Sequence, residues 1–500
     1  MADKNIKALY NWLSLTGFIV SANSLILILI FYLYSVLSQQ ANTYLGLYIY
    51  IVLPAFLVSG LILIPLGVAI NIRKRKAARL NDDLWPVIDL NKRKDWATVV
   101  KIFLITSLFL IASAMGSYRA YQYTESNEFC GLLCHQVEEP QYVTYQHSSH
   151  ARVTCVECHV GQGADWYVKS KISGLYQVYS TILKKYPRPI PTPIHSMRPQ
   201  SETCERCHWP EKFYSRKLRV QRFYLADSVN TEWNLSMVMK IGPEFKSIGN
   251  TEGIHWHINK NFKIEYASDT RNRESIPWIK LTNLKTGEVK VFLDQKNPLS
   301  KKVPDTLEVR TMDCMDCHNR ASHLFKSAPD YIDNAFVTGM LPKNLPYFKE
   351  AAMEALKAPF PDKDIAMPDI RNTIIRYYKD EHPEVLKSDE QRIRKAITAV
   401  QGEYNLNVFP YMKADASKYP NHIGHLESEG CFRCHSDRHK TAKGETISRN
   451  CDLCHTIIAQ GPTGNIANAY INTTLQFVHP TNISEKWKTE FCSECHHELY

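Results

Sequence analysis

The placement of cysteine constrains this chain more than any other feature of its 500 residues. The sequence contains 14 cysteines, and every one belongs to a closely spaced pair followed directly by histidine. The motifs, in chain order, are Cys130 and Cys134 with His135, Cys155 and Cys158 with His159, Cys204 and Cys207 with His208, Cys314 and Cys317 with His318, Cys431 and Cys434 with His435, Cys451 and Cys454 with His455, and Cys492 and Cys495 with His496. Six read C-x-x-C-H, whereas the first has one more residue between its thiols and reads C-x-x-x-C-H.

The C-x-x-C-H pattern is typical of covalent c-type haem attachment. Two thiols at this spacing can add to the two vinyl groups of one porphyrin, and the adjacent histidine then binds the iron as its proximal ligand. Zinc ribbons, thioredoxin-like pairs and disulfide frameworks also use paired cysteines, but none of them needs a histidine after every second thiol. The pattern therefore predicts seven covalently bound haem c groups.

Histidines outside the motifs are candidates for the second axial position, because low-spin electron-transfer haems usually bind a second histidine. Seven of the 19 histidines are proximal, which leaves 12 for seven irons. The predicted distal ligands are His150, His195, His257, His323, His425, His439 and His479. His255 and His257 flank Trp256 and would share one face of a strand, so we expect only one of the two to bind iron. For any single member of this set, a solvated or packing histidine is the alternative.

Two uncharged apolar stretches, residues 10–37 and 46–70, are each long enough to cross a bilayer as a helix. A third stretch, residues 98–116, is interrupted only by Lys101 near its start, and a lysine there can extend to the interface. The link between the second and third stretches holds eight Lys or Arg, and the link between the first two holds none. The positive-inside rule then places the N-terminus in the cytoplasm and residues 117–500 in the periplasm. We therefore expect a bacterial inner-membrane protein with three spans and a periplasmic haem domain.

The basic loop is explained by topology, so no nucleic-acid partner is expected. Residues 1–116 hold 11 Lys or Arg against 5 Asp or Glu, which accounts for +6 of the net charge of +10. The outer part is therefore only mildly basic, and haem propionates would lower its charge further.

The outer part changes character along its length. Leu235–Ile241, Phe262–Ala267, Trp278–Thr282 and Glu288–Leu293 have the alternation or β-rich content typical of strands. Asp330–Met340, Tyr347–Lys357 and Asp389–Gln401 have helical periodicity, and Pro329 suits a helix start. The predicted fold is a membrane-anchored multihaem cytochrome c, with three N-terminal transmembrane helices followed by a haem-packed, mainly α or irregular periplasmic part that carries a small β insertion.

The predicted divisions follow the same features. They are residues 1–97, two transmembrane helices and the basic loop; 98–116, the third transmembrane helix; 117–214, a membrane-proximal three-haem region; 215–305, the β-rich insertion; 306–410, a one-haem helical region; and 411–500, a C-terminal three-haem region.

The stretch Lys101–His208 resembles the NapC/NirT family of membrane-anchored multihaem quinol dehydrogenases. It carries an apolar helix, then Phe129–His135, then Ser148-Ser149-His150 leading into the second motif. The longer layout is similar to the large inner-membrane heptahaem cytochromes of metal-reducing bacteria (the ImcH type). Cys314–His323 and His425–His435 also look typical of that larger group.

The resemblance implies that the protein oxidises quinol from the membrane pool near the first haem and passes electrons to a periplasmic cytochrome or terminal reductase. His150 matches the family's histidine before the second motif, which implies a distal ligand. A lysine beyond that motif lines the quinol pocket in the family, and Lys169 and Lys171 both fall in range. Either lysine could instead be solvated or contact lipid headgroups.

Two departures from the family pattern concern the quinol end. The family commonly has methionine two residues after the first haem histidine, where this chain has Val137, so His135 and His147 are both candidate axial ligands of the first haem. No acidic residue stands at the family's usual offset after the lysine. The candidate proton acceptors are Glu138, Glu139 and Asp165.

Two other functions are compatible with the motifs. A multihaem terminal reductase of a small nitrogen compound such as nitrite or hydroxylamine needs one haem with an open coordination site. Such reductases often use C-x-x-C-K, which does not occur in this sequence. A non-catalytic cytochrome subunit of a larger respiratory complex would take its electrons from a partner protein, to which the first two apolar spans could dock.

Overall fold

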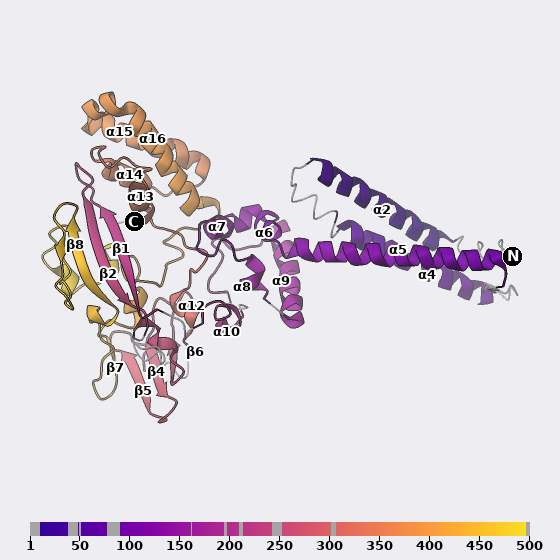
Figure 1. The fold of residues 1–500 in the computed structure, drawn as a ribbon, viewed down its shortest axis with the longest axis horizontal. Helices are drawn as coiled ribbons and strands as arrows, with labels where there is room; N and C mark the ends of the chain where they lie inside the picture. The colour runs from indigo at the N-terminus through magenta and orange to yellow at the C-terminus, as the bar shows by residue number, and fades with distance from the viewer. Residues whose placement is uncertain are drawn as a thin grey trace. The chain divides into compact units, whose positions relative to one another are not determined.

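The structure is a computed structural model that describes residues 11–38, 49, 52–77, 91–161, 163–194, 198–209, 214–242, 253–301 and 307–496. His195 lies outside the described residues, and so does the side chain of His135. The chain divides into two compact units, Met1–Glu138 and Glu139–Tyr500 (Figure 1). Each unit is described by itself.

The first unit contains a pair of apolar helices, α2 (Trp12–Ser38) and α4 (Leu53–Ala77), which lie side by side (Figure 1). Small residues allow this close approach: a Cβ added to Gly17 would lie 2.6 Å from the carbonyl oxygen of Gly60, and the Ser14 hydroxyl donates a hydrogen bond of 2.9 Å to the Ile64 carbonyl. Small side chains at the contact are typical of helices that associate in membranes. Within these helices, Trp12–Tyr34 and Leu53–Lys74 are long and apolar enough to cross a bilayer.

The third predicted span lies within α5 (Arg93–Thr124), a single helix of 32 residues. Ser126 then caps a short helix, α6 (Asn127–Leu132), by accepting a hydrogen bond from the Phe129 amide at 3.1 Å. Helix α7 (His135–Gln146) follows. Because caps satisfy amides that have no partner within the helix, this local sequence fixes where the first motif begins.

The second unit contains two antiparallel sheets. Strands β1 (Arg216–Tyr224), β2 (Glu232–Lys240), β8 (His455–Pro462) and β9 (Ala467–Asn468) form one sheet in that order. Strands β6 (Val309–Thr311), β3 (Phe262–Ala267), β4 (Trp278–Asn283), β5 (Val289–Asp294) and β7 (His439–Lys440) form the other. All four predicted strand segments lie in strands, but β7, β8 and β9 come from the C-terminal region. The β part is therefore not confined to residues 215–305, because strand pairing needs nearness in space and not in sequence.

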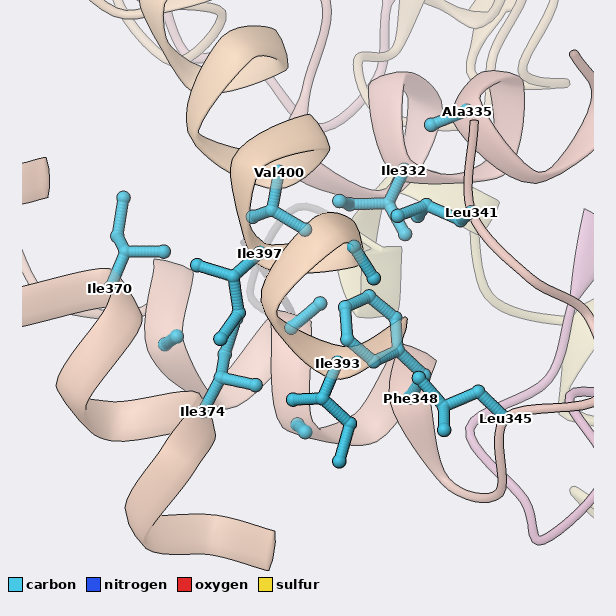
Figure 2. Packing of buried hydrophobic residues seen from close by; sticks show 14 of the residues in the cluster. Ile332, Ala335, Leu341, Leu345, Phe348, Ile370, Ile374, Ile393, Ile397 and Val400 are labelled. Atoms are coloured by element: carbon cyan, nitrogen blue, oxygen red, sulfur yellow. The ribbon is translucent and has the colours of Figure 1, made fainter. Parts of the chain in front are cut away.

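Four helices form the largest side-chain core: α13 (Ala328–Val337), α14 (Phe348–Leu356), α15 (Lys363–Glu381) and α16 (Pro383–Asn407). Figure 2 shows Ile332, Phe348 and Ile374 among the residues that meet there, and all three are fully buried. Pro329 lies in the first turn of α13, as predicted. Helix α15 was not predicted, because its charged residues and the internal Pro368 obscure the apolar period.

A buried polar cluster joins the β1–β2 hairpin to these helices. The Asn230 amide donates to the Leu345 carbonyl at 2.7 Å and accepts from the Lys349 amide at 2.9 Å. The Lys349 ammonium lies 2.6 Å from the Asp333 carboxylate, which also accepts from the Tyr224 amide. Since unpaired buried polar groups are costly, this satisfied cluster fixes the sheet against the helical core.

Candidate haem and quinol sites

The residues of the six regular motifs lie on short helical turns. The second, fourth and seventh motifs lie on α8 (Cys155–His159), α12 (Cys314–Cys317) and α17 (Cys492–His496), and the third follows α10 (Gln200–Thr203). The fifth and sixth motifs begin on the 3₁₀ turns η6 (Gly430–Arg433) and η7 (Cys451–Leu453). The His318 amide donates to the Cys314 carbonyl at 2.8 Å, and that of His208 to Cys204 at the same distance. One helical turn therefore gathers two thiols and an imidazole on one side, as covalent haem attachment requires.

The first motif is built differently, in keeping with its extra residue. Cys130 lies on α6, whereas Cys134 lies in the turn between α6 and α7, so the two thiols do not share one helix. The Cys134 carbonyl accepts hydrogen bonds from the Val137 amide at 2.9 Å and from the Glu138 amide at 3.0 Å. Cys134 therefore belongs to the start of α7, and attachment of a haem to Cys130 and Cys134 stays a prediction from the sequence.

Each of the six regular motifs presents its histidine to a second histidine from elsewhere in the chain. These six ring pairs, with the distances between ring centroids, are His208 and His150 at 5.9 Å, His159 and His323 at 6.2 Å, His318 and His255 at 6.3 Å, His435 and His257 at 5.8 Å, His455 and His425 at 6.3 Å, and His496 and His479 at 6.2 Å.

The ring pairs fit a haem iron. A nitrogen bound to a metal lies about 2 Å from it, so two imidazoles on opposite sides of one iron have centroids ~6 Å apart. The other ring nitrogen is held as expected: Nδ1 lies 3.0 Å from a backbone carbonyl oxygen in His150, His323 and His435. A carbonyl only accepts, so Nδ1 carries the proton and Nε2 keeps a lone pair for the metal. This second interaction is typical of metal-bound histidine.

Burial favours the neutral form of several of these imidazoles, which is the form that binds metal. Burial lowers the pKa of His255, His323 and His425 to about 4. Burial also lowers the pKa of the motif histidines His159 and His435. These rings therefore have the right charge for iron across the physiological pH range.

The second to seventh motifs lie near one another in chain order. Apart from burial, thiol pKa values are raised by a cysteine of the next or preceding motif. The interacting pairs are Cys158 with Cys204, Cys314 with Cys204, Cys317 with Cys431, Cys454 with Cys431, and Cys492 with Cys451. The second to seventh motifs thus form a continuous succession.

The alternative uses of paired cysteines fit less well. Among the described residues, no three His, Cys, Asp or Glu side chains come together as a metal cluster, and no disulfide joins the described cysteines. Burial raises the pKa of Cys317 to about 12 and that of Cys434 to about 11. Zinc sites and thiol redox sites need thiolates, so these surroundings favour uncharged thioethers.

The strand geometry expected for His255 and His257 is wrong. The two lie on the 3₁₀ helix η4 (Ile254–Ile258), where successive side chains turn by about 120°. They therefore point in different directions, and each faces a different motif histidine. The crowding on one strand face, from which we expected a single iron ligand, is therefore absent, while iron binding by either histidine stays a prediction.

The remaining predicted ligands are placed differently. His439 is fully buried with its Nε2 2.7 Å from the Ile276 carbonyl oxygen, and no ring pair links it to a motif histidine in the described chain. His195 and the ring of His135 fall outside the described residues. The Nδ1 of His147, an alternative ligand of the first haem, lies 2.9 Å from the Val143 carbonyl oxygen on its own helix.

The candidate quinol lysines lie on α9 (Ala164–Ile182). The Lys169 ammonium lies 4.7 Å from the centre of the Trp166 ring, and that of Lys171 lies 4.8 Å from the centre of the Tyr167 ring. The same helix exposes an apolar stripe at helical spacing, consisting of Val168, Ile172, Leu175, Tyr179 and Ile182. A cationic helix with an exposed apolar face can accommodate a lipid-soluble substrate with a polar head.

The three candidate proton acceptors differ in environment. Burial raises the pKa of Glu138, on α7, to about 6. Glu139 forms an ion pair of 3.0 Å with Lys363, and Asp165 is exposed in the first turn of α9. A base with a pKa near the working pH exchanges protons most effectively, so Glu138 is the best suited of the three.

Comparisons with known proteins agree with this picture. A family model described as the NapC/NirT cytochrome c family, N-terminal region, matches residues 92–223. The chain is 38% identical over 494 residues to the cytochrome c-type protein ImcH of Geobacter sulfurreducens, covering 98% of this chain and 95% of that protein. It is 32% identical over 118 residues to the cytochrome c-type protein NrfH of Wolinella succinogenes, covering 22% of this chain and 66% of that protein. No solved structure gives a significant match. The chain therefore belongs to the NapC/NirT family of membrane-anchored cytochromes c.

Proposed function

We propose that this protein oxidises a membrane quinol and conducts the electrons through seven c-type haems to a periplasmic acceptor. The observation that carries the proposal is the set of six ring pairs on motifs that follow one another in chain order. Family membership and the two apolar helices α2 and α4 support a donor that resides in the membrane.

In this proposal the cysteine pairs would hold the porphyrins, and the two histidines of each ring pair would bind one iron. Haem supplies a reversible one-electron couple, whose potential the chain sets through ligands, hydrogen bonds and burial. An iron bound by both histidines of a pair would leave no room for a substrate to bind it. The ring pairs therefore favour conduction over reduction of a small nitrogen compound.

The quinol step requires residues that bind the ring and accept protons. Oxidation of one quinol to quinone releases two electrons and two protons. Lys169 or Lys171 would hold a quinol oxygen, and Glu138 would accept a proton, because burial raises its pKa to about 6. The haem held by Cys130 and Cys134 would accept the electrons one at a time, and the two protons would be released to the periplasm.

The proposed topology has three spans with the N-terminus in the cytoplasm. Helices α2 and α4 would be the first two spans, and the apolar part of α5 would be the third. The absence of basic residues between residues 38 and 45, against eight in the next link, supports this orientation. Residues 117–500 would then lie in the periplasm, where haem is attached and where the acceptor is found.

Anaerobic mixing of the purified protein with a menaquinol analogue tests the proposal. We expect the absorbance of reduced haem to appear rapidly and a quinone-site inhibitor to block it. Reduction by dithionite but not by quinol would contradict quinol oxidation and favour a subunit that depends on a partner protein. Turnover of nitrite or hydroxylamine by the reduced protein would favour a reductase instead.

A further inference from the structure

The segment His255–Trp256–His257, called the strap below, lies on η4 in the connection between β2 and β3. His255 faces His318 of the fourth motif with ring centroids 6.3 Å apart. His257 faces His435 of the fifth motif at 5.8 Å. Two residues separated by a single tryptophan thus face two different motifs.

The loops of these two motifs are also held together directly. The Arg433 guanidinium, just before the second cysteine of the fifth motif, donates to the carbonyl of Asp316, which has the same place in the fourth motif, at 2.7 Å. The Asp316 carboxylate accepts from the Arg273 guanidinium at 2.7 Å and from the Asp313 amide at 2.8 Å. Arg433 and Asp316 are 6% and 2% exposed. Because a buried guanidinium that loses a hydrogen-bond partner is costly, the contact of Arg433 with the Asp316 carbonyl holds the two loops in one arrangement.

The strap is itself anchored. The Trp256 ring lies 5.0 Å from the Phe262 ring, centroid to centroid, and packs against the buried core of β3 and β4 that includes Ile264 and Tyr266. The His257 Nδ1 donates to the Ile254 carbonyl at 2.6 Å, which leaves Nε2 available to iron. The strap therefore has a fixed backbone and two rings directed to separate motifs.

We propose that His255 and His257 supply the sixth ligands of two different haems, those of the fourth and fifth motifs, so that one short segment serves both haems. The fourth motif is isolated in the sequence, with its first cysteine 110 residues after that of the third motif and 117 before that of the fifth. The strap and the Arg433–Asp316 contact make it continuous with the C-terminal cluster. The proposal rests on the haem loading proposed above but not on quinol oxidation.

Replacement of each histidine by methionine tests the strap. Methionine can bind haem iron and raises its potential, so it marks the affected haem without emptying the site. We expect His255→Met to change the spectrum and potential of one haem, His257→Met to change one other, and the double variant to change two. His382→Met is the matched control, because His382 stacks on Tyr347 with ring centroids 4.3 Å apart and its ring contacts within the described residues are all with tyrosines.

The measurements are electron paramagnetic resonance for ligand type, a potentiometric titration for the number of shifted haems, and pyridine haemochrome absorbance for covalent haem per chain. If either single variant leaves every haem spectrum and potential unchanged, or if the double variant changes only one haem, the proposed ligation by His255 and His257 is wrong. A wild-type haem count that lacks the fourth or fifth group overturns the haem loading on which the strap proposal rests.

Trp256→Phe, which keeps an aromatic anchor, should leave the signals of both haems unchanged. A Trp256→Phe protein that loses either signal would show that the anchored backbone, and not the histidine pair, determines ligation.

Discussion

The helical core and the haem-motif region of the second unit are built in different ways. In α13–α16, side chains such as Ile332, Ile374 and Val400 pack against one another until none is exposed (Figure 2). In the region of the second to seventh motifs, by contrast, Cys207, Cys451 and Cys495 are exposed. The paired histidine rings there have centroids about 6 Å apart, for example 5.9 Å and 6.3 Å in two of the pairs. The helical core is filled by its own apolar side chains. The motif region instead has paired histidines at the spacing that a haem iron between them would need.

Loss of haem should give the largest difference in stability between the motif region and the helical core. Replacing the cysteines of the second and third motifs by alanine (Cys155, Cys158, Cys204 and Cys207) removes two haems. We expect residues 155–209 to lose amide-exchange protection while α13–α16 keep theirs, because stability can differ between cooperative units of one chain. Hydrogen exchange with mass spectrometry measures both regions together. Equal protection of residues 155–209 in the variant and in the wild type would contradict the contrast.

A cavity in the helical core should destabilise α13–α16 and leave the motif region unaffected. Ile374→Ala removes a fully buried side chain, and such truncations cost about 2–5 kcal/mol. We expect the free energy of unfolding of α13–α16, measured with denaturant, to fall by this amount, while the haem spectrum stays unchanged at low denaturant. Ile365→Ala, on the same helix but half exposed, is the control and should shift unfolding far less. A changed haem spectrum in the Ile374→Ala protein would mean that the two regions are not independent.

The quinol lysines allow a smaller and local test. Loss of a charged hydrogen bond costs about 1.5–3 kcal/mol, so the variant of the binding lysine should lower kcat/KM for quinol by roughly tenfold to a hundredfold. Lys169→Gln and Lys171→Gln serve as controls for each other, since only one should have this effect. Steady-state quinol oxidation measures it. If neither variant lowers kcat/KM, neither lysine binds quinol.

Glu138 should have the smallest effect, visible as a pH dependence. Burial raises its pKa to about 6, and only the carboxylate can accept a proton. The rate of haem reduction by quinol should therefore fall as the pH drops through 6. In Glu138→Gln the rate should be lower above pH 6 and should lose this dependence. A stopped-flow pH profile of both proteins measures the difference, and an unchanged profile in Glu138→Gln would assign the proton to another group.

The sequence by itself determined the local chemistry. Two thiols and a histidine within one helical turn are fixed by spacing alone, so Cys204, Cys207 and His208 were assignable without a fold. The apolar helices and the central strands were also predictable, because their signals are periodic within one element. Family membership followed from the same short motifs.

Only the tertiary structure decided which histidine faces which motif. His150 precedes the second motif yet faces His208 of the third, and His323 follows the fourth motif yet faces His159 of the second. The 3₁₀ turn separates His255 from His257 where a strand would have aligned them. These pairings join residues up to 178 positions apart (257 and 435), and no local spacing encodes them, because distal ligation depends on how the whole unit folds around its haems.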